Sequence, residues 1–394
     1  MKKHLLPIIF LFFSLYSFAQ NDAYIKSFYT IDTASFQNSA HHWYDIFDDE
    51  NIINAVPNQP RYAATQIKEI ADNILLYQKN NGGWPKNYDM RAILTEQEKQ
   101  KLLAAKTDTN TTFDNSTTHS HVACLARVYY VIKDGRYKDA CLKGIDYILA
   151  SQYENGGWPQ FYPLQKNYSR EITYNDDVMT GIMNVLKDIL DSRPQYSFVD
   201  AARKAQAAEA YKRGLDCIFK TQIVVNGSAT AWCQQYDEVK LTPAWARKFE
   251  PPSICNRESV PVVLFLMSID NPDERTIHAV QSSVKWFNDS KILGIREKTI
   301  AAEPVKFKYR LSKTDKIVIA DSTAPPIWAR YYEIGSQKPL FCNRDGKPVY
   351  TLAEVERERR DGYTWYTYDP QLVLDKYKKW QQKWAPENNV LQKN

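Results

Sequence analysis

Apolar residues recur with the period of an α-helix in three stretches of the chain. In each stretch they stand seven, four and three residues ahead of a glutamine, and this spacing places them on one helix face. The positions are Ala71, Ile74 and Leu75 before Gln78, then Ile145, Ile148 and Leu149 before Gln152, and Leu215, Ile218 and Phe219 before Gln222. The pattern predicts three amphipathic helices that end near these glutamines.

A turn motif follows the glutamines and repeats at a fixed interval. Asn-Gly-Gly-Trp-Pro occupies residues 81–85 and again 155–159. The interval from Trp84 to Trp158, taken once more, leads to Trp232, so a third and divergent copy is present. We expect glycine at the helix C-caps and proline to stop each helix. We interpret the tryptophans as packing groups in the turns rather than as platforms for sugar rings.

A second, nearly all-apolar segment follows each turn, at residues 121–132, 178–190 and 259–269. Helices that are apolar on all sides are typical of a buried layer. Outer amphipathic helices that alternate with buried inner ones predict an all-α fold, namely an α/α barrel or toroid of three helical hairpins over about residues 50–300. An open helical solenoid is the structural alternative.

The remainder of the chain is less regular. Residues 307–311 and 316–320 predict a short β-hairpin, and residues 370–384 predict a terminal helix. No linker marks a second domain, so we predict one catalytic domain over residues 20–394, with residues 300–394 forming a C-terminal cap on the toroid.

The N-terminus has the layout of a secretory signal peptide over residues 1–19. Lys2 and Lys3 precede an apolar run, and Ser17 and Ala19 supply small residues at a cleavage site. No later stretch is long and apolar enough for a transmembrane helix. We therefore expect export into the periplasm or the medium, without a membrane span.

Composition narrows the class of partner. A formal net charge of +5, to which Lys2 and Lys3 contribute, is too mild to indicate nucleic acid. An aromatic content of 13%, with 26 tyrosines, suits carbohydrate ligands. The six cysteines show no Cys-x-x-Cys spacing, so neither a zinc ribbon nor a disulfide scaffold is indicated. We expect a monomer.

Polar residues cluster where the chain enters the inner helices. Because the inner helices of a toroid run parallel, these entries meet at one end of the barrel. Asp114, Asn115, Asp176 and Asp177 would then bring hard oxygen ligands to one rim, and such ligands suit Ca²⁺ when substrate or water completes the shell. Taken one at a time, these carboxylates, like Glu258, are more simply helix N-caps.

Arginines flanked by aromatic residues crowd the last third of the chain. Arg247, Arg330 and Arg344 stand beside Trp, Phe, Tyr or Pro, where half-buried guanidinium groups bind carboxylates in a bidentate manner. A calcium rim beside several arginines indicates a site for a polycarboxylate.

The strings that carry these features resemble one family. The two Asn-Gly-Gly-Trp-Pro motifs, FDNSTTHSH (113–121), YNDDVM (174–179), PAWARKFEPPS (243–253), WARYYEI (328–334) and ERRDGYTWY (358–366) resemble the pectate lyases of polysaccharide lyase family ten, over roughly residues 50–370. The resemblance implies a three-hairpin α/α barrel and calcium-assisted β-elimination of polygalacturonate. The stretch 298–321 is longer than the resemblance implies.

The resemblance also implies roles for single residues. It makes Asp114 and Asp176 the calcium ligands, with Asn115 and Asp177 beside them, and Arg247 the catalytic base. Arg257 competes for that role, although the resemblance implies serine or glycine there. Substrate would be bound by four residues, which are Arg330, Arg344, Lys86 and Tyr174.

An arginine base needs explanation, because guanidinium is ordinarily protonated at any physiological pH. We expect calcium and neighbouring arginines to lower the pKa of Arg247, with activity rising into the alkaline range. Three other functions stay open. Asp114 and Asp176 are also suited to be the acid and base of a glycoside hydrolase, a pectin-binding protein could lack catalysis, and Gln-x-x-x-Gly-Gly-Trp resembles a motif of terpenoid cyclases.

Overall fold

The computed structural model describes residues 22–32, 51–54, 56, 58–307 and 311–392. The predicted signal peptide lies outside these residues. The main helices are α3 (Ile67–Tyr77), α4 (Glu96–Ala104), α5 (His119–Ile132), α6 (Gly135–Ala150), α7 (Val178–Leu190), α8 (Ala201–Thr221), α9 (Asn256–Met267), α10 (Glu274–Ser290), α11 (Arg357–Gly362) and α12 (Pro370–Trp384). The described chain is therefore mostly helical, as predicted.

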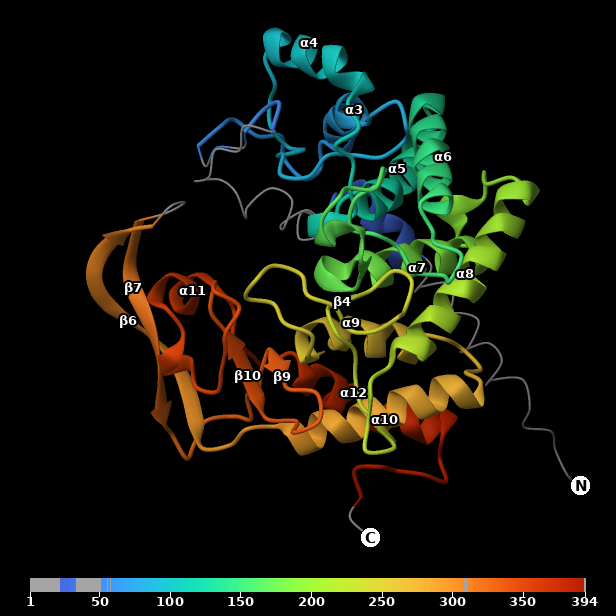
Figure 1. Cartoon of the computed structure of the whole chain (residues 1–394). Coiled ribbons are helices and arrows are strands. Elements are labelled where there is room, and N and C mark those ends of the chain that lie inside the picture. Colours follow the sequence, from blue (N-terminus) through green and yellow to red (C-terminus); the bar gives the residue numbers. More distant parts are fainter. Residues whose placement is uncertain (1–21, 33–50, 55, 57, 308–310, 393–394) are drawn as a thin grey trace, which may run out of the picture.

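The strands are short except for one hairpin. They are β1 (Ile172–Thr173), β2 (Val224–Val225), β3 (Ser228–Ala229), β4 (Gln235–Tyr236), β5 (Ile254–Cys255), β6 (Ile295–Lys306), β7 (Leu311–Ala320), β8 (Trp328–Ala329), β9 (Tyr331–Tyr332), β10 (Pro339–Cys342), β11 (Pro348–Val349) and β12 (Tyr366–Thr367). Figure 1 shows α3 to α6 at the top, α10 and α12 at the bottom, and the β6–β7 hairpin along one side.

The helices form two layers. The apolar helices α5, α7 and α9 pack in series, α5 on α7 and α7 on α9, and the outer helices α3, α6, α8 and α10 pack in series behind them. Inner residues such as Leu125, Ile182 and Val263 are fully buried. The three predicted inner helices are thus confirmed, and for α7 the bounds agree to the residue.

The repeated glutamine and tryptophan fix each turn by the same bonds. The indole nitrogens of Trp84, Trp158 and Trp232 donate to Ile74, Ile148 and Ile218 O at 2.8, 2.9 and 2.7 Å. The amide of each glutamine donates both to its own turn and to the next outer helix: Gln78 bonds Ala140 O, Gln152 bonds Ala210 O and Gln222 bonds Ala279 O. All three tryptophans are fully buried, so they are packing groups, as interpreted.

The glycines act in the turns and not at the helix C-caps, which corrects the sequence prediction. Helix α3 ends at Tyr77 and its C-cap, Gln78, is extended. Gly82 and Gly156 each lie four residues after a repeated glutamine, Gln78 or Gln152, and both adopt a left-handed φ of 94°. Each turn also lies against the next outer helix, where a Cβ on Gly156 would come within 1.9 Å of Arg213 O.

Replacing Gly156 by alanine should therefore lower the free energy of unfolding by about 3 kcal/mol, from left-handed strain plus overpacking. Gly227→Ala is the matched control, because its φ is 78° but a Cβ there would meet no atom within 4 Å. We expect the control to lose only about 1 kcal/mol. Denaturant unfolding measures both values, and equal losses would rule out the close approach as the cause.

Short strands bring part of the C-terminal third of the chain against the first turn of α9. Strand β9 pairs with β5 on one side, Cys255 opposite Tyr331, and with β10 on the other. Helix α12 packs on α9 and α10, and its bounds confirm the predicted terminal helix. This pairing carries Arg330, between β8 and β9, to the first turn of α9.

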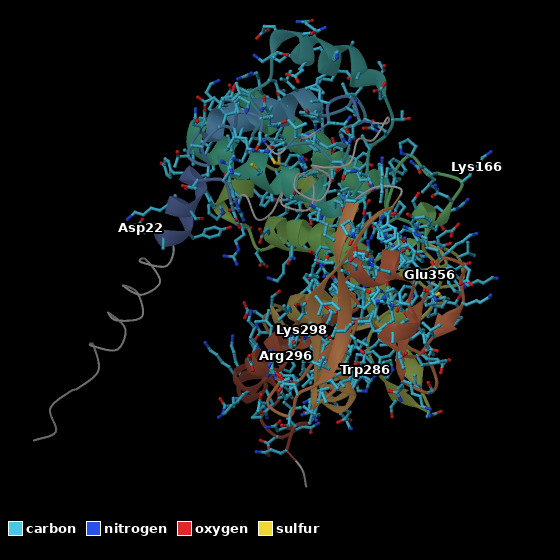
Figure 2. All side chains as sticks on the ribbon, turned by 90° about the vertical axis from the view of Figure 1, so that its left-hand side faces the viewer. Asp22, Lys166, Trp286, Arg296, Lys298 and Glu356 are labelled. Carbon is cyan, nitrogen blue, oxygen red and sulfur yellow. The ribbon has the colours of Figure 1, made fainter. Side chains whose placement is uncertain are left out.

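A β-hairpin is present, and its predicted second strand, 316–320, lies in β7. The predicted first strand, 307–311, is wrong, because β6 ends at Lys306 and β7 begins at Leu311, while residues 308–310 lie outside the described residues. Strands β6 and β7 pair from Ile295 with Ala320 to Lys306 with Leu311. Figure 2 turns this hairpin toward the viewer and labels Arg296 and Lys298 on β6. It is joined to α11 by Arg360, which donates to Asp315 at 2.8 and 2.6 Å.

All six cysteines lie in the described chain and are free and buried. Among the described residues, none of the helices is both long and apolar enough to span a bilayer.

Candidate active site

The chain enters α5 and α7 through two short 3₁₀ turns, Asp114–Ser116 and Asn175–Asp177, that are in contact with each other. The second turn also contacts α9. Asn115 and Asp176 both adopt left-handed backbone angles, φ 53° and 51°. Asn and Asp tolerate this conformation better than other non-glycine residues. The predicted convergence of polar entries at one rim is confirmed.

The carboxyl groups of Asp114 and Asp176 belong to the two 3₁₀ turns that are in contact at this rim. Burial, followed by the charges of Asp114 and Glu258, raises the pKa of Asp176 well above its usual range. Burial would also raise the pKa of Asp114, but its ion pair with Lys86 outweighs this and lowers it. Two neighbouring acidic groups favour a bound cation, because a cation relieves their repulsion.

Asn115 and Asp177 have other partners. The Asn115 side chain donates to Asn87 Oδ1 at 2.8 Å. Asp177 accepts from Thr180 Oγ1 at 3.4 Å and lines a groove of about 480 Å³ between α5, α7 and α9. Across the described ranges, no group of three or more His, Cys, Asp or Glu side chains is arranged to hold a metal ion.

Two of the predicted substrate-binding residues lie in very different surroundings. Lys86 is partly exposed, forms an ion pair with Asp114 and lies 5.4 Å from the centre of the Phe161 ring. Tyr174 is only 2% exposed, and its hydroxyl bonds Thr221 Oγ1 at 2.6 Å. Its ring packs in the core against Tyr236, so the prediction that Tyr174 binds substrate is corrected: this side chain cannot reach a ligand at the rim.

Arg247 is held by Glu250 in a bidentate ion pair. Its Nε donates to Glu250 Oε2 at 2.7 Å, and its guanidinium stacks 4.9 Å from the centre of the Phe249 ring. The Arg247 side chain is 46% exposed, whereas that of Glu250 is 1% exposed. Burial would lower the pKa of Arg247, but Glu250 outweighs it and raises the pKa well above the usual value. In the ligand-free protein the surroundings of Arg247 thus raise its pKa, and the lowering expected from bound calcium with neighbouring arginines stays a prediction.

Arg330 lies deeper, beneath the acidic pair. Its Nη2 donates to Glu258 Oε1 at 2.7 Å and to Asn175 Oδ1 at 3.3 Å. The Asn175 amide in turn donates to Asp176 Oδ2 at 2.6 Å. Arg330 thus connects the first turn of α9 to the acidic pair and supplies a positive charge below it.

Arg344 lies on the surface beside Phe249. Its side chain is 45% exposed and forms a bidentate pair with Glu358, at 2.7 and 3.0 Å. The guanidinium groups of Arg247, Arg344 and Arg359 all lie about 5 Å from the Phe249 ring centre, at 4.9, 5.2 and 4.8 Å. One buried aromatic ring therefore gathers three cations at the edge of the site.

Two residues of this arrangement were absent from the sequence prediction. Glu250 follows Arg247 by three residues in a turn, which the Glu250 N–H closes by donating to Arg247 O at 2.7 Å. Tyr363 donates to Glu250 Oε1 at 2.8 Å, and its ring lies 4.6 Å from the guanidinium of Arg330. Only the fold shows this second contact, because Tyr363 reaches Glu250 across 113 residues.

Comparison with known proteins agrees with this geometry. The family model described as pectic acid lyase matches residues 78–374. Two solved structures of a family 10 polysaccharide lyase from Cellvibrio cellulosa are 28% identical to the chain, each with a TM-score of 0.67. They cover 80% of this chain, which spans 96% and 95% of theirs, and one of them is a mutant in complex with trigalacturonic acid. A comparison with curated proteins gives no match.

The family match extends over most of the chain and includes every element that builds the rim, from the first Gln-x-x-x-Gly-Gly-Trp turn to the start of α12. The chain is a member of the pectic acid lyase family, and its enzymatic class is that of a pectate lyase.

Proposed function

We propose that this protein cleaves de-esterified polygalacturonate by calcium-dependent β-elimination and releases 4,5-unsaturated oligogalacturonates. The observation that carries the proposal is the Asp114–Asp176 pair, in which Asp114 is paired with Lys86 and Asp176 is connected to Arg330 through Asn175. Its relative from Cellvibrio binds trigalacturonic acid, a short form of the same polymer. We further propose that the helical hairpins close into an α/α toroid and that the protein is exported by its signal peptide and acts as a monomer.

Calcium fits the donors at the rim. Asp114 and Asp176 offer carboxylate oxygens and Asn115 is the third candidate ligand, whereas Asp177 is directed toward Thr180. Ca²⁺ takes six to eight oxygen ligands, so substrate and water would supply the rest. When bound, the ion would act as a Lewis acid that withdraws charge from the uronate carboxylate and so acidifies the neighbouring C5 hydrogen.

The arginines have separate tasks in this proposal. Arg344, which is exposed, would bind a substrate carboxylate after exchange with Glu358. Arg330, which is buried, would stabilise the negative charge that develops at the reacting uronate. Lys86 balances Asp114 and becomes available to substrate when a cation takes over that carboxylate.

Arg247 would remove the C5 proton. The C–H electron pair forms the C4=C5 double bond, the bond from C4 to the glycosidic oxygen breaks, and water protonates the departing oxygen. Glu250 and Phe249 hold the guanidinium in one orientation, which is the geometric requirement for a base.

A base with a raised pKa predicts a steep pH profile. Glu250 keeps Arg247 protonated, so the deprotonated fraction is small near neutrality and grows about tenfold for each pH unit below the pKa. We expect kcat/KM to rise with pH with a slope near one on logarithmic axes through the alkaline range, measured at saturating calcium. A plateau that begins at neutral pH would exclude Arg247 as the base.

Product analysis separates this proposal from its alternatives. β-Elimination yields products that lack one water relative to hydrolysis products, and mass spectrometry resolves the two. Saturated products would favour a glycoside hydrolase that uses Asp114 and Asp176. Binding of polygalacturonate without any product would favour a pectin-binding protein.

A further inference from the structure

The three repeats share a backbone hydrogen bond to the repeat tryptophan, and in each repeat a polar or charged residue stands two positions after the donor of that bond. The backbone N–H groups of Thr112, Thr173 and Cys255 donate to the carbonyl oxygens of the three repeat tryptophans, at 3.0, 2.9 and 2.7 Å. Two residues beyond these anchors stand Asp114, Asn175 and Arg257. Arg257 is therefore the contribution of the third repeat at the position that the first repeat fills with a carboxylate.

The neighbours of Arg257 belong to the site. Glu258 is buried and pairs with Arg330, and its charge acts on Asp176. Burial raises the pKa of both Asp177 and Glu258, and the positive charge of Arg257 opposes both rises. Arg257 itself is half-buried in the first turn of α9.

Arg257 differs from the other cations of the site in forming no hydrogen bond or ion pair with the described residues. Four cations are already ion-paired: Lys86 with Asp114, Arg247 with Glu250, Arg330 with Glu258 and Arg344 with Glu358. A uronate that binds any of these must displace a protein carboxylate, whereas Arg257 needs no exchange. A ligand carboxylate can pair with this guanidinium directly, through a charge-assisted hydrogen bond.

We propose that Arg257 binds a carboxylate of the polygalacturonate chain and so contributes to the selection of uronates that are not esterified. This inference rests on the proposed function, because it takes the polymer as the substrate. Arg257 would recognise a uronate next to the one being cleaved. A methyl ester at that uronate would remove the charge that the guanidinium pairs with.

The test compares Arg257→Gln and Arg257→Lys with Arg275→Gln. Arg275 is an exposed arginine on α10 that pairs with Asp216, so its variant loses the same charge outside the site. For Arg257→Gln we expect KM on polygalacturonate to rise about tenfold with kcat nearly unchanged, the loss of one charge-assisted bond. Arg257→Lys should recover part of that loss, and Arg275→Gln should behave like the unsubstituted protein.

Selectivity gives a second readout. The Arg257→Gln variant should lose part of its preference for polygalacturonate over partially methyl-esterified pectin, which a merely structural role would not change. An unchanged KM, an equal rise in Arg275→Gln, or a lower kcat at constant KM would each overturn the inference.

Two different measurements distinguish failure of the lyase proposal from failure of the inference about Arg257. If the unsubstituted protein gives no unsaturated product, the lyase proposal fails, but calorimetry with trigalacturonate still decides on Arg257. A dissociation constant about tenfold weaker in Arg257→Gln would support the inference, and an equal constant would overturn it. Equal thermal midpoints of the proteins exclude misfolding, and Arg257→Lys serves in place of Arg257→Gln if the midpoint of the latter falls.

Discussion

Replacing Arg247 by lysine is expected to lower kcat by about a thousandfold while binding of polygalacturonate changes little. Lysine keeps the positive charge but loses the planar group that pairs with Glu250 and stacks on Phe249, so no basic nitrogen is held at the same position. The absorbance of unsaturated product gives kcat, and calorimetry with trigalacturonate gives the affinity.

Arg359→Lys is the matched control for that experiment. Arg359 lies 4.8 Å from the same Phe249 ring and pairs with Glu358, but the proposed mechanism gives it no role in proton transfer. We expect its kcat to stay within a few-fold of the unsubstituted value. Near-normal turnover in Arg247→Lys, or an equal loss in both variants, would remove Arg247 from the role of base.

Substitution of Asp176 by asparagine should have the second largest effect. Loss of one of two carboxylates weakens the calcium site, and we expect kcat/KM to fall about a hundredfold at limiting calcium and to recover partly at high calcium. Asp177→Asn is the matched neighbour, and because its carboxyl is directed toward Thr180 we expect a much smaller loss. Activity measured against calcium concentration distinguishes the two.

The same variant has an opposite effect on stability. Burial, followed by the charges of Asp114 and Glu258, raises the pKa of Asp176, so a negative charge on this group is unfavourable in the folded protein and the Asp176→Asn substitution removes that cost. In the presence of a chelator we therefore expect Asp176→Asn to unfold at a higher temperature than the unsubstituted protein. A lower thermal midpoint would show that the two carboxyl groups do not repel each other in the calcium-free state.

The helical core was predictable because its signals are local. The apolar composition of residues 178–190 is enough to predict a buried helix, and α7 has the same bounds. The repeated Gln and Trp predicted that the three turns have the same structure. In each turn the indole of the Trp donates to an isoleucine carbonyl in the preceding helix.

The long hairpin was predicted too short for a physical reason. Most residues of β6 are at least partly exposed, so its apolar and polar positions do not alternate clearly. Its contacts also come from distant segments, as Ser312 donates to Asp361 at 2.6 Å. Because polar contacts with a distant segment hold this hairpin, its sequence lacks the alternation of apolar and polar residues that predicts a strand.

The acidic residues and arginines of the site were predictable, but not their partners. Lys86 pairs with Asp114 across 28 residues and Arg330 with Glu258 across 72, and no local pattern encodes such distances. Tyr174 shows the reverse error, since it stands in the same motif as Asp176 but its side chain enters the core. Adjacent residues at a turn can face opposite sides, and sequence proximity does not reveal which.

The most direct test of calcium-dependent β-elimination is the ultraviolet absorbance of unsaturated products when the protein is mixed with polygalacturonate, first with calcium and then with excess chelator. The account predicts a steady rise in absorbance that the chelator abolishes and that added calcium restores. New reducing ends without absorbance, or a rise that the chelator leaves unchanged, would contradict calcium-dependent β-elimination.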